Sequence, residues 1–119
     1  MKLDMDYHVS LVKMFYNIPL SEIKAFVESE ATIDEYITQQ ISNLDDDDFT
    51  VAYMAFSMRI CVYGMRVGKT ERTRGIIFVQ FNELADKLER FFGTSVVVRP
   101  EPLGTIEGEQ SLKRLKLLI

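Results

Sequence analysis

The chain has 119 residues and a mass of 13.8 kDa, which suits one domain and is too short for two separate cores. An apolar fraction of 47% with 27% charged residues excludes an intrinsically disordered chain, and a net charge of −4 disfavours a general nucleic-acid binder. The single cysteine, Cys61, permits no intramolecular disulfide and favours a reducing compartment. We therefore expect one globular domain over residues 1–119, located in the cytoplasm.

Charge is unevenly distributed along the sequence. Residues 1–48, here called the acidic front, hold 3 basic and 11 acidic residues, which gives a net charge of −8. Residues 49–99 hold 8 basic and 4 acidic residues, a net charge of +4, and the last twenty residues balance at 3 against 3. The two regions either face each other in the fold and neutralise, or form separate surfaces that attract oppositely charged partners.

The chain begins with a strict alternation of polar and apolar residues from position 2 to position 11. This period of two predicts a strand with one buried face. His8 falls on the polar face of that strand. With no second histidine and no nearby cysteine, it is interpreted as a solvated or hydrogen-bonded residue and not as a metal ligand or catalytic base. The charges in this segment also leave no apolar core for a signal peptide.

Two short helices with one apolar face each are predicted next. Ser21 is the expected N-cap of the first helix, which follows Pro19. The second helix begins at Thr32, because Thr32 and Glu35 have the spacing of a capping box. Both helices should pack onto another part of the fold.

Four consecutive aspartates, Asp45, Asp46, Asp47 and Asp48, follow the second helix. They lack the alternating ligands, central glycine and closing glutamate of an EF-hand loop, so no calcium site is predicted. Carboxylates in a first turn stabilise a helix N-terminus, and Arg66 would suit the other end of the same helix. The aspartates are also the candidate binding residues of the acidic front, including as a mimic of nucleic-acid phosphates.

Residues 49–65 are apolar on every side. Their alanine and methionine content favours a buried central helix, although the β-branched and aromatic residues at 60–63 keep a strand as the alternative. The segment is short for a membrane span and carries Arg59 near its centre, which argues against insertion into lipid.

The remaining segments are predicted as strand, helix and strand. Residues 75–81 have high β-propensity, Asn82 would cap a helix ending at Gly93, and residues 94–99 form a strand that ends at Pro100. Apolar residues three and four apart make one long helix from Arg74 onward the alternative. Residues 111–119 are either a strand or a short amphipathic helix. The predicted fold is α+β, with short helices on a small, mainly antiparallel sheet; the alternative is a mostly α fold with a minor β element.

The segment from Gly64 to Thr70 resembles a Walker A loop over seven residues. Three residues instead of four separate Gly64 from Gly68, and the flanks lack the expected strand and helix. We interpret the segment as a basic turn. One histidine, one cysteine and serines without an activating context predict no catalytic, metal or cofactor site, so the protein is expected not to be an enzyme.

The densest positive cluster, here called the basic loop, comprises Arg66, Lys69, Arg72 and Arg74. Such loops bind phosphates, and arginine forks also bind carboxylates of proteins. No aromatic platform of the kind found in single-strand binders lies within it. We expect a small acidic protein-interaction module, an adaptor, inhibitor or assembly component of the kind frequent among viral and plasmid accessory proteins. Its expected partners are another protein and a second copy of itself, with no membrane; the alternative is nucleic-acid or phosphate-ligand binding through the basic loop.

Overall fold

The computed structural model describes residues 2–99, and these form helices joined by short turns. The helices are α1 (Lys2–Tyr16), α2 (Leu20–Glu28), α3 (Ile33–Gln40), α4 (Asp46–Val67) and α5 (Glu71–Phe92). Between residues 2 and 99 there is no strand, so the predicted α+β fold with a small antiparallel sheet is wrong. The minor β element of the alternative is likewise absent from this part of the chain. The expectation for residues 111–119 lies outside the described residues.

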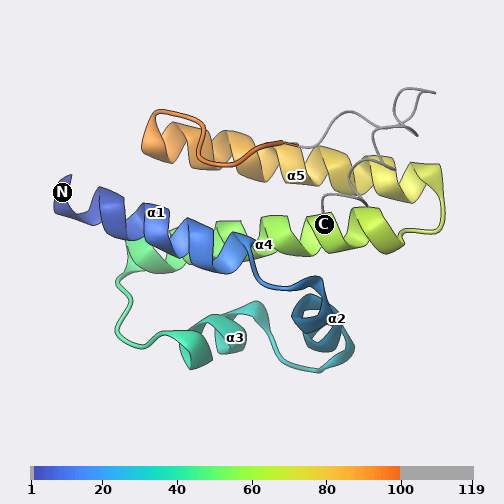
Figure 1. Cartoon of the computed structure of the whole chain (residues 1–119), viewed down its shortest axis with the longest axis horizontal. Helices are drawn as coiled ribbons and strands as arrows, with labels where there is room; N and C mark the ends of the chain where they lie inside the picture. Colours follow the sequence, from blue (N-terminus) through green and yellow to red (C-terminus); the bar gives the residue numbers. More distant parts are fainter. Residues whose placement is uncertain (1, 100–119) are drawn as a thin grey trace.

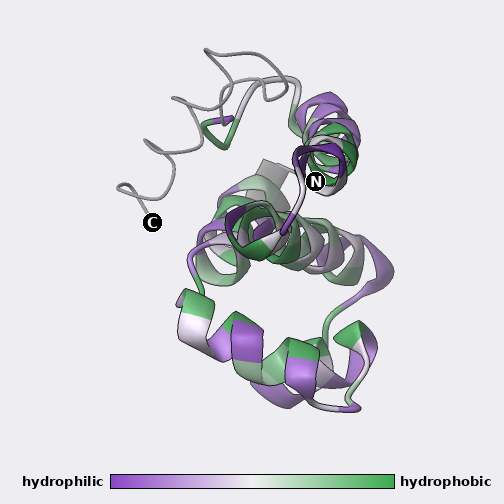
Figure 2. Cartoon of the chain, turned by 90° about the vertical axis from the view of Figure 1, so that its right-hand side faces the viewer, coloured by the Kyte–Doolittle hydropathy of each residue, from purple (hydrophilic) through white to green (hydrophobic). Residues whose placement is uncertain are grey.

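Helix α4 forms the centre of the fold and contacts each of the other helices (Figure 1). Helix α1 runs parallel to its N-terminal half, since His8 meets Asp48 and Phe15 meets Phe56. Helix α5 returns antiparallel along α4, and the α2–α3 pair covers the opposite side. Figure 2 shows the same order end on, with α5 and the α2–α3 pair on opposite sides of α4.

Helix α1 replaces the predicted N-terminal strand. Its buried residues are His8, Leu11, Val12 and Phe15, which are spaced three and four apart and so line one face of a helix. Tyr7, which belonged to the predicted buried face, is exposed. The polar His8 sits in the apolar stripe and interrupts it, so the local alternation concealed the helical period.

Helix α5 replaces the predicted strand at residues 75–81, and the alternative of one long helix is confirmed. Phe81, Ala85 and Leu88 are buried at helical spacing. Asn82 lies inside the helix and not at its N-cap, and its amide nitrogen donates to the Phe78 carbonyl at 3.0 Å. The predicted stop at Gly93 is confirmed by its left-handed φ of 76°.

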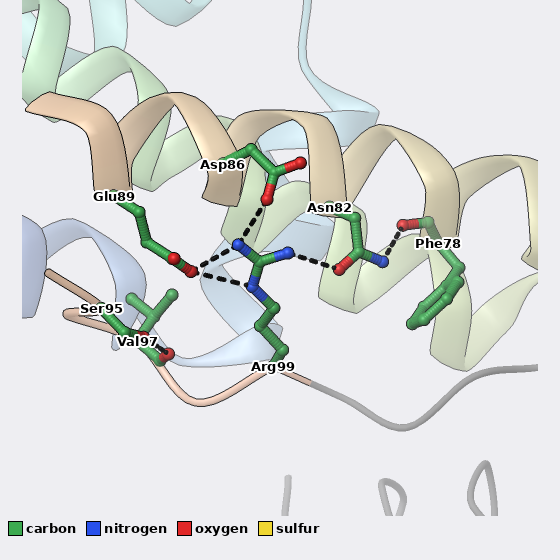
Figure 3. Close-up of polar contacts among 7 residues, drawn as sticks. All are labelled: Phe78, Asn82, Asp86, Glu89, Ser95, Val97 and Arg99. Atoms are coloured by element: carbon green, nitrogen blue, oxygen red, sulfur yellow. Dashed lines mark hydrogen bonds and ion pairs between the residues drawn. The ribbon is translucent and has the colours of Figure 1, made fainter.

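The predicted strand at residues 94–99 is also absent. Beyond Gly93 the chain turns back along α5 without pairing to another segment, and Arg99 fastens it there (Figure 3). Valine-rich sequence favours extended backbone, but a strand needs a neighbour to receive its hydrogen bonds. The elements that surround residues 94–99 are helices and offer no strand for pairing.

Local signals placed the ends of the middle helices. The predicted capping box of Thr32 with Glu35 is present at α3. Asp45 forms a similar box with Asp48 at α4. The buried central helix is confirmed, with Arg66 in its last turn. Helix α2 begins two residues earlier than predicted, with Pro19 in the N-cap position in place of Ser21.

The side chain of Phe56 joins the layers of the core. Its ring centroid lies 6.2 Å from that of Phe15 on α1 and 5.0 Å from that of Phe26 on α2. The Tyr36 ring of α3 stacks on it at 4.6 Å with an interplanar angle of 3°. The first three helices therefore meet at one residue of α4.

Arg59, the charge inside the apolar segment, ties the end of α1 to α4. Its Nε donates to the Ile18 carbonyl at 2.8 Å, and its guanidinium carbon lies 5.9 Å from the centre of the Tyr16 ring. Burial lowers the pKa of Arg59 and raises the pKa of Tyr16. The guanidinium stays charged at neutral pH because its ordinary pKa is so high.

Candidate functional site

The basic loop lies at the turn that joins α4 to α5. The Gly68 amide donates to the Gly64 carbonyl at 2.8 Å and closes α4, while the Thr73 amide donates to the Thr70 hydroxyl at 3.1 Å and opens α5. The predicted turn is confirmed only for residues 68–70, because Gly64 to Val67 belong to α4. The expectation that no helix follows the segment is wrong, since α5 begins at Glu71. A helix precedes Gly68, where a Walker A loop would require a strand.

Gly64 and Gly68 allow the close approach of backbone at this turn. A Cβ added at Gly64 would stand 3.0 Å from Cδ1 of Ile77 on α5. A Cβ added at Gly68 would stand 2.8 Å from Cγ of Arg74 and 2.9 Å from the Gly64 carbonyl oxygen. The two glycines therefore allow α4 and α5 to pack closely in the hairpin. From the sequence alone, their spacing pointed to phosphate binding only through its resemblance to a Walker A loop.

The four residues of the basic loop differ in their surroundings. Arg66, Lys69 and Arg72 are exposed. Arg74 is half-buried, and its Nη1 donates to the Gly68 carbonyl at 2.9 Å. Arg74 thus satisfies backbone at the C-terminal end of α4, where a cation also interacts favourably with the helix dipole. The other three point their charges into solvent.

These three exposed cations have no ionic partner among the described side chains. No Asp or Glu oxygen of residues 5–99 lies within 4.0 Å of a side-chain nitrogen of Arg66, Lys69 or Arg72. Arg72 stands in the first turn of α5, where the dipole makes a positive charge unfavourable by about 0.3–1 kcal/mol. Its charge therefore does not stabilise the helix that carries it.

Three exposed apolar side chains lie on α4 and α5, the two helices that the basic loop joins. Val67 ends α4 with 51% of its surface exposed, and on α5 Ile76 and Val79 are exposed by 52% and 54%. Arg72, Ile76 and Val79 are spaced four and three apart, so they share one face of α5. Figure 1 shows this end of the hairpin extending past the end of α1. We call these six residues, Arg66, Val67, Lys69, Arg72, Ile76 and Val79, the α4–α5 end.

The four aspartates are divided between surface and core. Asp45 is the N-cap of α4, and Asp46 and Asp47 are exposed in its first turn. Asp48 is only 9% exposed and accepts a hydrogen bond of 2.8 Å from Nε2 of His8, which is 6% exposed. Asp48 is thus part of the core and not of a binding surface. Of the two readings of His8, the hydrogen-bonded one is confirmed.

The aspartates and the basic loop lie at opposite ends of α4. A helix rises 1.5 Å per residue, so the ends of this 22-residue helix are about 30 Å apart. At physiological salt, charges are screened over about 8 Å. These two clusters therefore do not neutralise each other within one molecule and form separate surfaces.

Sequence reasoning missed a polar cluster around Arg99 (Figure 3). The guanidinium donates to Asp86 at 2.6 Å, to the Asn82 amide oxygen at 3.0 Å, and through Nη2 and Nε to Glu89. The hydrogen bond with Asp86, followed by that with Glu89, raises the pKa of Arg99. Residues 82, 86 and 89 share one face of a helix, and the sequence predicted a helix from Asn82 to Gly93. What it did not predict is that residues 94–99 turn back along this helix and bring Arg99 to that face.

A shallow hollow between α4 and α5 contains Cys61. Its lining residues are Ser57, Cys61, Gln80, Glu83, Leu84 and Lys87. Burial raises the pKa of the Cys61 thiol to about 11, so the thiol is protonated at neutral pH. A protonated thiol is a weak nucleophile and a poor metal ligand, which gives this hollow no evident chemistry.

Within the described part of the chain, no three His, Cys, Asp or Glu side chains converge as a metal site would require. None of the helices between residues 2 and 99 combines the length and the apolar character of a membrane span. No family model, curated protein or solved structure matches this chain.

Proposed function

We propose that the protein is a small, non-enzymatic protein-interaction module that binds an acidic partner protein through the α4–α5 end. The observation that carries the proposal is the presence of three exposed cations, without carboxylate partners among residues 5–99, with three exposed apolar side chains on the two helices that the basic loop joins. The single cysteine of the protein, Cys61, is half-buried and suits a reducing compartment, so we propose that the protein is located in the cytoplasm.

The combination of charge and apolar surface favours a protein as the partner. Arginine is enriched at protein interfaces because its planar fork binds carboxylates in two places and its stem packs on apolar groups. Val67, Ile76 and Val79 would contribute buried apolar area, for which a phosphate backbone has no counterpart. The matching surface on the partner would carry carboxylates around an apolar centre.

The α4–α5 end is also held in place before any partner binds. The Gly68 and Thr73 amides and the Arg74 guanidinium are all hydrogen-bonded within the turn. A surface that is ordered in advance loses less conformational entropy on binding. This supports a stable docking surface and not a loop that folds only on contact.

Co-purification from the native host with three forms of the protein tests the proposal. The turn variant Arg66→Gln/Lys69→Gln/Arg72→Gln removes the exposed cations. The control Lys13→Gln/Lys24→Gln/Lys87→Gln removes the same net charge from exposed lysines elsewhere. We expect a partner that is recovered with the wild type and the control and is depleted with the turn variant, while circular dichroism shows equal helix content. Recovery of the same proteins in equal amounts by all three forms would refute the proposal.

A second candidate function is the binding of nucleic acid or another phosphate ligand at the same turn. The observation that favours it is the position of Arg72 in the first turn of α5, where the backbone amides and the helix dipole also attract anions. Fluorescence anisotropy with a labelled oligonucleotide pool at low salt tests it. Salt-sensitive binding that the turn variant loses and the lysine control keeps would support this candidate, and an absence of binding would eliminate it.

A further inference from the structure

The opposite end of the molecule has chemistry complementary to the α4–α5 end. Asp45, Asp46 and Asp47 are exposed there. Tyr7 and Phe91, which are 42% and 41% exposed, flank His8 with ring-centroid distances of 6.5 Å and 5.2 Å. Because His8 is bonded to Asp48, both aromatic rings lie close to the start of α4. We call Asp45, Asp46, Asp47, Tyr7 and Phe91 the acidic end.

We infer that the acidic end of one copy binds the α4–α5 end of a second copy, so that molecules associate head to tail. This inference rests on the proposed function and names the partner as the protein itself. Each end combines charges mostly of one sign with exposed apolar side chains, and the prevailing signs are opposite. The exceptions are Glu71 at the α4–α5 end and Arg90 beside Phe91 at the acidic end. The carboxylates of Asp46 and Asp47 would meet the cations of Arg66, Lys69 and Arg72, while Tyr7 and Phe91 would cover Val67 and Ile76.

The separation of the two ends determines the kind of assembly. They lie about 30 Å apart along a rigid helix, so one molecule cannot satisfy both by folding on itself. A contact between two different surfaces leaves one free surface of each kind after every addition, which produces open chains or closed rings. An end face of 34 Å by 21 Å is at most comparable with the ~800 Å² per partner of a standard interface. The association should therefore be weak and dependent on concentration.

Sedimentation equilibrium of the wild type provides the first measurement. The weight-average mass should rise with protein concentration in about 0.02 M salt, where screening is weak. Raising the salt to about 0.5 M should weaken the association constant about tenfold, because exposed ion pairs contribute most of the attraction. The lysine control should associate like the wild type.

A complementation experiment identifies the contact as head to tail. Asp46→Asn/Asp47→Asn removes charge from the acidic end and leaves the Asp45 cap and the buried Asp48 intact. Alone, this variant and the turn variant should each remain monomeric. Mixed in equal amounts, they should form dimers and no larger species, because each supplies the one intact surface that the other lacks.

Two results would overturn the inference. A wild type that stays monomeric at about millimolar concentration in low salt excludes self-association of this kind, since even a standard weak complex is populated there. A wild type that associates while the two variants fail to complement each other excludes the head-to-tail contact. If the wild type is monomeric but the turn variant still loses a different co-purifying protein, the proposed function stands and only the identity of the partner changes.

Discussion

The buried pair of His8 and Asp48 is the residue-scale feature with the greatest consequence for stability. The His8 ring lies among Tyr7, Phe91 and Phe92, and its Nε2 donates to Oδ1 of Asp48. The other Asp48 oxygen accepts from the Asp45 amide. The carboxylate thus joins α1 to the N-terminus of α4, and the His8 ring lies against Phe91 and Phe92 at the end of α5.

We predict that His8→Ala and Asp48→Ala each lower the free energy of unfolding by about 2 kcal/mol, because each leaves a buried polar partner unsatisfied. The double variant should cost less than the sum of the two, with a coupling of about 1 kcal/mol in a double-mutant cycle. Urea denaturation measures these values. Asp47→Ala is the exposed control and should cost less than about 1 kcal/mol, the size of a dipole interaction. Strictly additive effects would contradict an energetic role for the hydrogen bond.

The basic loop shows what residue types could predict at this scale. Its position in a turn and the exposure of Arg66, Lys69 and Arg72 follow from polar residues next to glycines. The different role of Arg74 does not, because its bond to the Gly68 carbonyl depends on how α5 turns back beside α4. Similarly, residue type alone does not distinguish the four consecutive aspartates. Three of them are exposed and Asp48 is buried, because only Asp48 meets His8.

At the scale of elements, the wrong predictions of secondary structure lie mostly in segments where two periodicities coexist. Residues 2–11 alternate and also continue a helical stripe through Phe15. Residues 75–81 are rich in β-branched and aromatic side chains and also belong to a stripe that reaches Phe92. Two of the predicted caps, Thr32 and Gly93, are present, since they act through bonds and backbone angles within a few residues. Ser21 and Asn82, which were also predicted as N-caps, lie inside α2 and α5. Period and propensity are settled by neighbours, whereas caps are local.

Two glycines of α5 provide a prediction about the element itself. Gly75 lies inside the helix, and a Cβ added there meets no atom within 4 Å, so Gly75→Ala should raise the free energy of unfolding by about 0.5–1 kcal/mol. Gly93 has a φ of 76°, so Gly93→Ala should lower it by about 1 kcal/mol. Thermal and urea unfolding of both variants should show shifts in opposite directions. A destabilising Gly75→Ala would indicate that residue 75 does not lie within a helix.

At the scale of the whole molecule, Phe56 unites the layers. It contacts rings from α1, α2 and α3 and is fully buried on α4. Phe56→Ala should lower the free energy of unfolding by about 3–5 kcal/mol through lost burial and the cavity that remains. If that variant does not fold, Phe56→Leu should lower it by less than about 1.5 kcal/mol and keep the transition cooperative.

The exposed Val79 is the matched control for this core substitution, and Val79→Ala should change stability by no more than about 0.5 kcal/mol. Urea unfolding followed by circular dichroism and by tyrosine fluorescence distinguishes two models. A single shared transition is expected of one core joined at Phe56. Separate transitions for the α2–α3 layer and the α1–α4–α5 layer would contradict it.

The sequence by itself determined the central buried helix, the caps at Thr32 and Gly93, and the uneven distribution of charge. Each depends on composition or on interactions within one turn of the chain. Tertiary structure decided that α1 and α5 are helices, that His8 and Asp48 are buried together, and that the negative and positive clusters lie at opposite ends of α4. Those outcomes depend on which apolar face finds a partner, because burial against α4 outweighs the local preference of any single segment.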